Sequence, residues 1–307
     1  FGTAGCFSRL SFAGVTLAAL YCLALPLRNG LPYHYQHLVW FAALCAASPC
    51  GDALSIDSWR RRRAGPPSHP RSPVYGLPIR VAWLLLGAIF FFPGLWKLRS
   101  AGFAWMTGDN LRNQLYWKWA TVPGLVPPFR IDRAPWLLHA GAAGVVLLEL
   151  TFGLAVWHRT LRVVAVAAAL HFHAFARVFM GIDFSGLWPT YVVFVDWDAL
   201  ARRWDLGKRE SGASTSASTG PVDARMTSGR LGLTLLVGTV LVAGAVEAGA
   251  RGATTGWPFA CYPTFQETAG TRMPALAVSI VTWDGREHPV DANESAAAGP
   301  RGNTCKI

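Results

Sequence analysis

Residues 80–110 read RVAWLLLGAIFFFPGLWKLRSAGFAWMTGDN, and this stretch decides the fold. The apolar run Val81–Leu95 has the length of a helix and leads directly into Trp96 and Lys97. A lysine beside such a run is costly unless its amine reaches the membrane interface or does chemistry in a sheltered cavity. We therefore ask which other parts of the chain surround Lys97.

The composition points to a membrane protein. Of 307 residues, 52% are hydrophobic and only 15% are charged, against about 25% in soluble domains. The net charge of +11 does not indicate nucleic-acid binding, because the basic residues gather in short loops between apolar runs. We therefore expect contact with membrane lipid and none with nucleic acid.

Seven apolar runs predict an all-α, polytopic membrane bundle of about six or seven transmembrane helices. A span needs about 20 residues, so the second and sixth runs are short. The runs cover approximately residues 10–27, 38–48, 79–98, 136–157, 163–180, 184–195 and 231–250.

Basic stretches between these runs predict the orientation in the membrane. WRRRR (59–63), HRTLR (158–162) and DWDALARRW (196–204) all fall on one side, which the positive-inside rule assigns to the cytoplasm. The N-terminus is then cytoplasmic as well. The segment 99–133 and the tail that follows the last span are expected outside, and the membrane is most simply a bacterial inner membrane.

The predicted organisation has four parts. They are a transmembrane core over 1–200, a flexible cytoplasmic linker over 201–230 that contains SGASTSASTG, a last transmembrane helix over 231–250, and an extracytoplasmic tail over 251–307. The tail contains the alternating stretch ALAVSIVTWDGREHPV, in which Asp284-Gly285 is a candidate hairpin turn.

Lys97 and Glu149 are the first two candidates for chemistry. Burial disfavours the charged form of an amine, which is how a lysine becomes a base; the alternative for Lys97 is an interfacial anchor. Glu149, in LLELTFGLAVW, lies more than one turn inside its span. A carboxyl group there needs a proton or a cationic partner on another helix, and both interpretations stay open.

The fifth run contains His171, His173 and Arg177. Two residues apart on a helix are rotated by about 200°, so only one of the histidines faces the bundle. Arg177 shares a face with His173, and the two together are candidates for holding an anion or a quinone oxygen. Only His34 and His37, three residues apart, could supply two metal ligands from one helical face, so we expect no metal site.

The order of these features resembles that of the HTTM-domain membrane proteins, relatives of the vitamin K-dependent γ-carboxylase. The resemblance covers about residues 7–198. It rests on YHYQHLVWFAALCAASPCGDALSID (33–57), FFFPGLWKLR (90–99), LLEL (147–150) and HFHAFARVFMGIDFSGLW (171–188). The carboxylase has two adjacent lysines at the helix end, where this chain has Trp96-Lys97.

This resemblance implies roles for particular residues. Lys97 matches the base that acts on reduced vitamin K, and His34, with His37 as the second choice, matches a histidine of the same site. His173 and Glu149 match a histidine and an acidic residue within the membrane. Trp96, His171 and Arg177 are candidate quinone-binding residues. The implied cofactor is a reduced quinone (vitamin K or menaquinone hydroquinone), with O₂ and CO₂ as co-reactants when a glutamyl peptide is carboxylated.

Two functions are therefore expected as alternatives. The first is a γ-carboxylase-like membrane enzyme, a lyase or oxidoreductase, that modifies a peptide or protein substrate at the outer face. The second is a non-enzymatic scaffold that binds lipid or quinone and docks a partner through its exported tail. The second hypothesis draws on Cys261 and Cys305, which could form a disulfide in an oxidising compartment.

Overall fold

The computed structural model describes residues 4–25, 35–52, 55–62, 73–203, 224–254, 256–259, 268–270 and 279–289. The chain divides into two compact units, Phe1–Ala269 and Gly270–Ile307. Each unit is described by itself.

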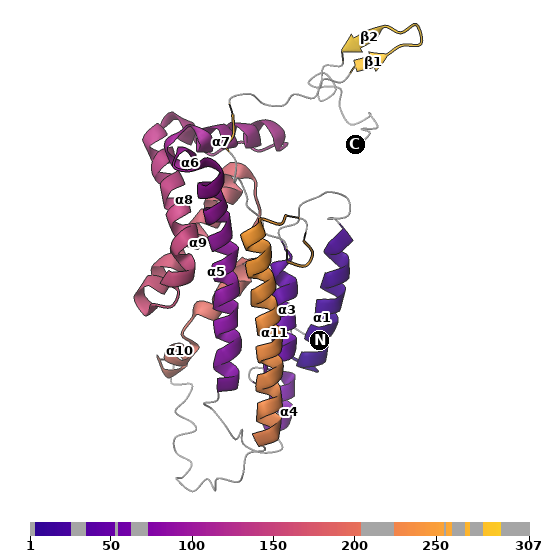
Figure 1. Ribbon diagram of the computed structural model, residues 1–307, viewed down its shortest axis with the longest axis vertical. Helices are drawn as coiled ribbons and strands as arrows, with labels where there is room; N and C mark the ends of the chain where they lie inside the picture. The colour runs from indigo at the N-terminus through magenta and orange to yellow at the C-terminus, as the bar shows by residue number, and fades with distance from the viewer. Residues whose placement is uncertain are drawn as a thin grey trace. The chain divides into compact units, whose positions relative to one another are not determined.

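The first unit is a helix bundle (Figure 1). Its long helices run side by side, with α6 and α7 at the end of the bundle opposite α4 and α10. In chain order the elements are α1 (Ser8–Cys22), α3 (His37–Ala47), α4 (Ile56–Arg62), α5 (Pro73–Ala101), α6 (Ala104–Thr107), α7 (Asn110–Thr121), η1 (Ile131–Arg133), α8 (Pro135–Ala155), α9 (Arg159–Met180), η2 (Trp188–Phe194), α10 (Trp197–Arg203) and α11 (Ala224–Arg251).

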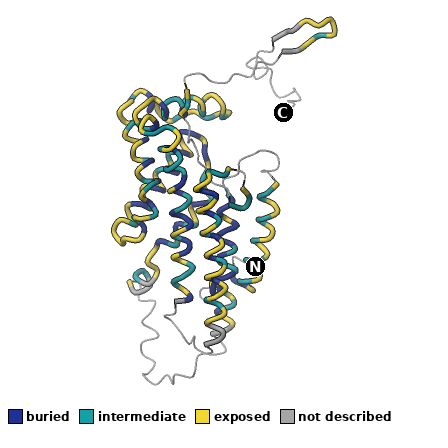
Figure 2. The backbone as a smooth tube through the Cα atoms, viewed as in Figure 1, coloured by how far each residue is buried: buried dark blue, intermediate teal, exposed yellow. Residues whose placement is uncertain are grey.

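Four helices of the described chain, α5, α8, α9 and α11, are long and apolar enough to cross a membrane. Large apolar side chains remain exposed on them, including Leu147, Leu154, Val163 and Leu236. Exposed residues recur along the long helices (Figure 2). Such surfaces are stable against lipid and unfavourable in water. The protein is a helical membrane protein.

Among the described residues the number of candidate spans is four, which is lower than the six or seven predicted. The first two apolar runs form α1, of 15 residues, and α3, of 11 residues, both below the length of about 20 that a full span requires. The sixth run becomes η2, a 3₁₀ helix of 7 residues with proline at its start. Strained 3₁₀ geometry does not extend over long stretches, so this segment is a connector between α9 and α10.

Glycines bring α5 and α8 together. A Cβ atom on Gly87 would lie 3.1 Å from the Cα of Gly153, and one on Gly94 would lie 2.8 Å from the Cβ of Glu149. Small residues at such positions let two helix backbones approach closely inside a membrane. Gly94 therefore sets the distance between α5 and the segment of α8 that carries Glu149.

We expect Gly94→Ala to destabilise the bundle by about 1–3 kcal/mol, because the added methyl group overpacks the α5–α8 contact. The measurement is the thermal unfolding midpoint in nanodiscs. Gly76→Ala on the same helix is the matched control, since a Cβ there meets nothing within 4 Å. Equal midpoints for the two variants would refute the close contact.

The end of α9 returns the chain toward the bundle. Gly181 has a positive φ of 65°, the amide of Gly181 donates to the Arg177 carbonyl, and that of Ile182 donates to the Ala176 carbonyl. This is the glycine-terminated motif that satisfies the last carbonyls of a helix. It directs Ile182 and Phe184 back over the bundle interior.

Helix α7 fastens a segment that follows α11. The Asn110 Oδ1 accepts a hydrogen bond of 2.8 Å from the Ala269 amide, and the Asn113 Nδ2 donates one of 2.9 Å to the Ala269 carbonyl. Two side chains on one helix thus satisfy both main-chain groups of the same residue.

The second unit contains a hairpin of β1 (Ser279–Val281) and β2 (Glu287–Pro289), paired antiparallel with Ile280 opposite His288. Its turn includes Asp284 and Gly285, and Gly285 has a φ of 81°, which glycine adopts without strain. Cys261 and Cys305 lie outside the described residues.

Candidate functional site in the bundle interior

A cavity of about 410 Å³ lies within the bundle. This volume is in the range of small-molecule pockets. Its walls are mostly apolar and come from α3, α5, α6, α7, η1, α8, α9 and α11 together with the segment after α9. The polar lining side chains are Gln36, His37, Lys97, Gln114, Glu149, His171 and His173.

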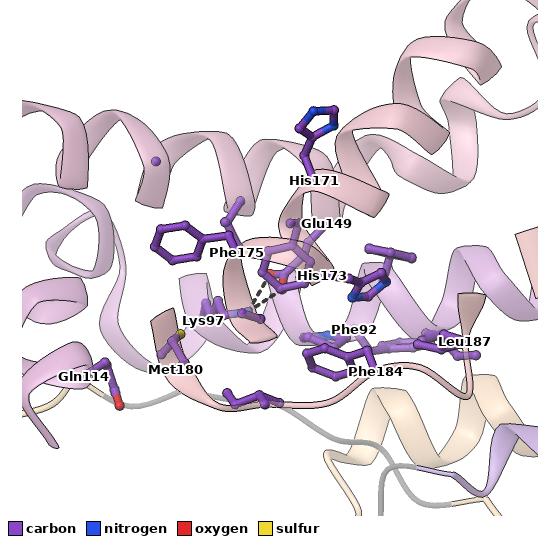
Figure 3. Close-up of a pocket in the computed structure, with 18 of the residues that line it drawn as sticks. Phe92, Lys97, Gln114, Glu149, His171, His173, Phe175, Met180, Phe184 and Leu187 are labelled. Atoms are coloured by element: carbon purple, nitrogen blue, oxygen red, sulfur yellow. Dashed lines mark hydrogen bonds and ion pairs between the residues drawn. The ribbon is translucent and has the colours of Figure 1, made fainter. Parts of the chain in front are cut away.

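Lys97 and Glu149 form a buried ion pair on this wall (Figure 3). The Lys97 Nζ lies 2.5 Å from one carboxylate oxygen of Glu149 and 2.7 Å from the other. Lys97 is 2% exposed and Glu149 is 4% exposed. Lys97 is therefore not an interfacial anchor, and Glu149 has the cationic partner that one of its two interpretations required.

An aromatic ring closes the space around the pair. The Lys97 Nζ lies 5.2 Å from the centroid of the Trp105 ring of α6, and Trp105 is buried. The π face of an indole stabilises a nearby cation, and its bulk excludes water. The ion pair is therefore shielded from bulk solvent, with the Trp105 ring beside the amine.

His173 has a buried polar partner, Tyr191 of η2. Its Nε2 lies 2.7 Å from the Tyr191 hydroxyl oxygen. The imidazole packs among Phe90, Phe172 and Phe184. This bond fixes the ring orientation and couples the tautomer of His173 to the direction in which the tyrosine hydroxyl points.

Some buried polar atoms of the cavity wall lack a hydrogen-bond partner among the described residues. They include the Nδ1 of His173 and the Oε1 of Gln114. Buried polar atoms are rarely left unpaired, because each loses its hydrogen bonds to water. They mark the positions where a ligand with hydroxyl or carbonyl groups would form hydrogen bonds.

Of the other predicted quinone-binding residues, His171 lines the cavity without facing the ion pair, and Trp96 lies outside the cavity wall. His171 is exposed, its Nδ1 lies 2.7 Å from the Ala167 carbonyl, and its ring is directed away from Lys97, Glu149 and His173 in Figure 3. The Trp96 Nε1 donates to the Gly249 carbonyl of α11, and Trp96 is not part of the cavity wall.

Arg177 does not form the predicted pair with His173. Its side chain is 57% exposed and lies 3.5 Å from Asp183, whereas His173 is 2% exposed. A long charged side chain on an apolar helix extends toward a polar environment, which explains why the shared helix face did not bring the two groups together.

His34 lies outside the described residues, so its predicted role stays a prediction. His37, the second choice, is buried at the start of α3 and lines the cavity. No group of three metal-ligating side chains occurs in the described ranges.

Gln114 and Tyr191 belong to the site but were not among the predicted residues. Gln114 lies in NLRNQLYWKWAT, which reads as a polar surface helix, and Tyr191 lies in a short apolar stretch. Neither pattern carries a periodic signal that would turn the side chain inward. Both were brought to the site by packing of segments distant in the chain.

A second ionic cluster secures the connection between α7 and α8. The Arg130 guanidinium donates to both oxygens of Asp132, at 2.8 Å and 2.7 Å, and the Tyr116 hydroxyl donates to Asp132 at 2.9 Å. The Arg130 guanidinium, and after it the Tyr116 hydroxyl, hold the pKa of Asp132 well below its usual value of 3.8. The cluster ties η1 to α7.

This cluster predicts a loss of stability in acid. A carboxyl group with a lowered pKa in the folded state stabilises the fold above its ordinary pKa, and this contribution disappears as the pH falls through the folded-state pKa. We expect the thermal midpoint of the wild type to fall more steeply below about pH 4 than that of Asp132→Asn. Asp109→Asn, at an exposed pair with Arg112, should leave the acid profile unchanged.

The profile of the family described as the HTTM domain matches residues 3–195, more than half of the chain. The match includes the whole cavity wall except Ala245 and Gly249 of α11. No curated protein and no solved structure matches the chain. The ion pair, the His173–Tyr191 pair and the cavity that they line are thus features of a chain that belongs to the HTTM-domain family.

Proposed function

We propose that this protein is a γ-carboxylase-like membrane enzyme that binds a reduced quinone in the central cavity, with Lys97 as the base. The observation that carries the proposal is the buried Lys97–Glu149 pair on the wall of an apolar cavity that also contains an unpartnered nitrogen of His173. Membership of the HTTM-domain family supports the same chemistry.

The residues fit such a ligand. Phe90, Phe92 and Phe184 present aromatic surfaces to the cavity, which suit the faces of a fused ring. The polar atoms of Lys97, Glu149 and His173 can reach oxygen atoms on a ring edge. A volume of about 410 Å³ is sufficient for a bicyclic head group.

Glu149 provides Lys97 with a way to lose its proton inside the membrane. Burial removes the hydration that stabilises the charged forms of Lys97 and Glu149. The free-energy difference between the charged pair and the neutral pair is therefore smaller than in water. A proton that moves from the Lys97 Nζ to the Glu149 carboxylate leaves a neutral amine at the cavity wall. That amine then accepts a proton from a hydroxyl group of the ligand.

His173 orients the ligand in this proposal. When the Tyr191 hydroxyl donates to Nε2, the proton of the imidazole resides on Nδ1, which donates a hydrogen bond into the cavity. The bound quinol would supply the hydroxyl proton and, toward O₂, the reducing electrons. The residues of the chain hold it, exclude water and receive its proton.

The proposal includes an orientation and a compartment. Helix α4 ends in the arginine-rich stretch, and HRTLR (158–162) lies at the start of α9, directly after the connection from α8. The positive-inside rule assigns this end of the bundle to the cytoplasm of a bacterial cell and the end with α6 and α7 to the outer face. A peptide or protein substrate, together with CO₂, would then arrive from outside.

The test is oxygen consumption by the purified protein in nanodiscs supplied with reduced menaquinone. We expect uptake by the wild type and loss of at least about 99% of it in Lys97→Ala, since general base catalysis commonly contributes 10²-fold or more. The double variant Lys97→Met/Glu149→Leu separates catalysis from folding, because it removes the base without leaving a buried charge. Uptake at the wild-type rate in a folded double variant would exclude Lys97 as the base.

The alternative function is a non-enzymatic scaffold that binds lipid or quinone. The observation that favours it is the completeness of the ion pair, in which both carboxylate oxygens of Glu149 are bonded to Lys97. An ion pair that only stabilises the fold needs no further bonding partner. The scaffold predicts that reduced menaquinone quenches the fluorescence of Trp105 and Trp40 in the cavity wall while the wild type consumes no oxygen.

A further inference from the structure

The C-terminal end of α3 brings two thiols together. Cys45 lies in the last turn of α3, and the turn Ser48-Pro49 reverses the chain so that Cys50 returns to it. The Cys50 Sγ donates a hydrogen bond of 3.1 Å to the Cys45 carbonyl oxygen, and the two thiol groups also contact each other. Both cysteines are free.

The surroundings favour a thiolate at Cys50. The Cys45 thiol, which can donate a hydrogen bond to a Cys50 thiolate, lowers the pKa of Cys50, and the positive charge of Arg9 acts in the same direction. Partial burial and the negative charge of Asp52 oppose this effect, but the pKa of Cys50 stays below its ordinary value. Arg9 is held in place by hydrogen bonds to the Ala46 and Ala47 carbonyls, which lie between the two cysteines in the sequence. Cys50 itself is exposed.

We propose that Cys45 and Cys50 form a redox-reactive dithiol, in which Cys50 reacts first with a peroxide and Cys45 resolves it to a disulfide. The Cys50 thiolate attacks the O–O bond of the peroxide and becomes a sulfenic acid, with release of hydroxide. The Cys45 sulfur then displaces the sulfenic oxygen as water. In total, two thiols and one hydrogen peroxide give one disulfide and two waters.

The location of this dithiol connects it to three helices. The Ala47 carbonyl, next to the pair, accepts hydrogen bonds from Arg9 of α1 and from Thr234 of α11. A disulfide would link the last turn of α3 covalently to the turn that follows this junction. The dithiol is independent of the cavity chemistry, because neither cysteine lines the cavity.

The experiment treats the full chain in nanodiscs with hydrogen peroxide and identifies disulfides by mass spectrometry after digestion without reductant. We expect a linked Cys45–Cys50 peptide, which dithiothreitol converts back to two thiols. Cys6, a free cysteine just before α1, is the internal control. We also expect iodoacetamide to alkylate Cys50 at neutral pH about tenfold faster than Cys6, because the Cys50 thiol is exposed and its pKa is lowered.

Two variants assign the roles. In Cys45→Ser, oxidation should stop at a sulfenic acid on Cys50 that dimedone traps, whereas Cys50→Ser should leave Cys45 as a thiol. Cys6→Ser should form the same disulfide as the wild type. The proposal is overturned if Cys45 and Cys50 both remain thiols while Cys6 is oxidised, or if Cys50 pairs with Cys6 instead. The wild-type measurement decides this even where a variant fails to fold.

Discussion

Replacing Lys97 by methionine is expected to lower the stability of the protein by about 3–5 kcal/mol, the typical cost of leaving one member of a buried ion pair without its partner. Methionine preserves most of the side-chain volume, so the effect comes from the charge. The Glu149 carboxylate, 4% exposed, would have to remain charged without a cation or take up a proton. Either outcome makes the folded state less favourable.

Removing both charges should reverse most of this loss. Lys97→Met with Glu149→Leu replaces the pair by apolar side chains, a change that is often neutral or stabilising. The measurement is thermal unfolding in nanodiscs, followed by tryptophan fluorescence. If Lys97→Met unfolds at the wild-type temperature, the pair is not energetically coupled to the fold.

An exposed ion pair supplies the matched control. Arg159 lies 3.4 Å from Asp196, with side chains 81% and 45% exposed. Surface pairs contribute at most about 1 kcal/mol, so Arg159→Met should change the midpoint only slightly. The difference in thermal midpoint between Lys97→Met and Arg159→Met then measures the effect of burial. The loss of an ion pair as such is common to both variants.

The second large effect is expected at His173. His173→Gln should weaken the binding of reduced menaquinone by about 10- to 100-fold, which corresponds to about 1–3 kcal/mol for a hydrogen bond in a buried site. Tyr191→Phe should weaken it less, because the imidazole remains but its tautomer is no longer set by the hydroxyl. Anaerobic titration, followed by quenching of tryptophan fluorescence, gives the dissociation constants.

His171→Gln is the control for this prediction. His171 lies two residues away on the same helix, and its ring is directed away from the His173 side of the cavity. We expect the dissociation constant of His171→Gln for reduced menaquinone to match that of the wild type. Equal losses of affinity in the two glutamine variants would mean that the ligand does not bind beside His173.

The long helices of this protein could be predicted from the sequence alone. Apolar runs over 79–98, 136–157, 163–180 and 231–250 became α5, α8, α9 and α11, because run length and apolar composition are local properties that determine whether a segment can satisfy its own backbone in lipid. The opposite facing of His171 and His173 also followed from helix geometry alone.

The tertiary structure determined which residues form the site. Lys97 and Glu149 are 52 residues apart, and they meet because Gly94 lets α8 approach α5, a contact that no local pattern encodes. The same packing turned Gln114 of an apparently polar helix inward and left Arg177 outside with Asp183. Which side chains share a cavity depends on how helices pack, and that is determined by contacts between segments far apart in the chain.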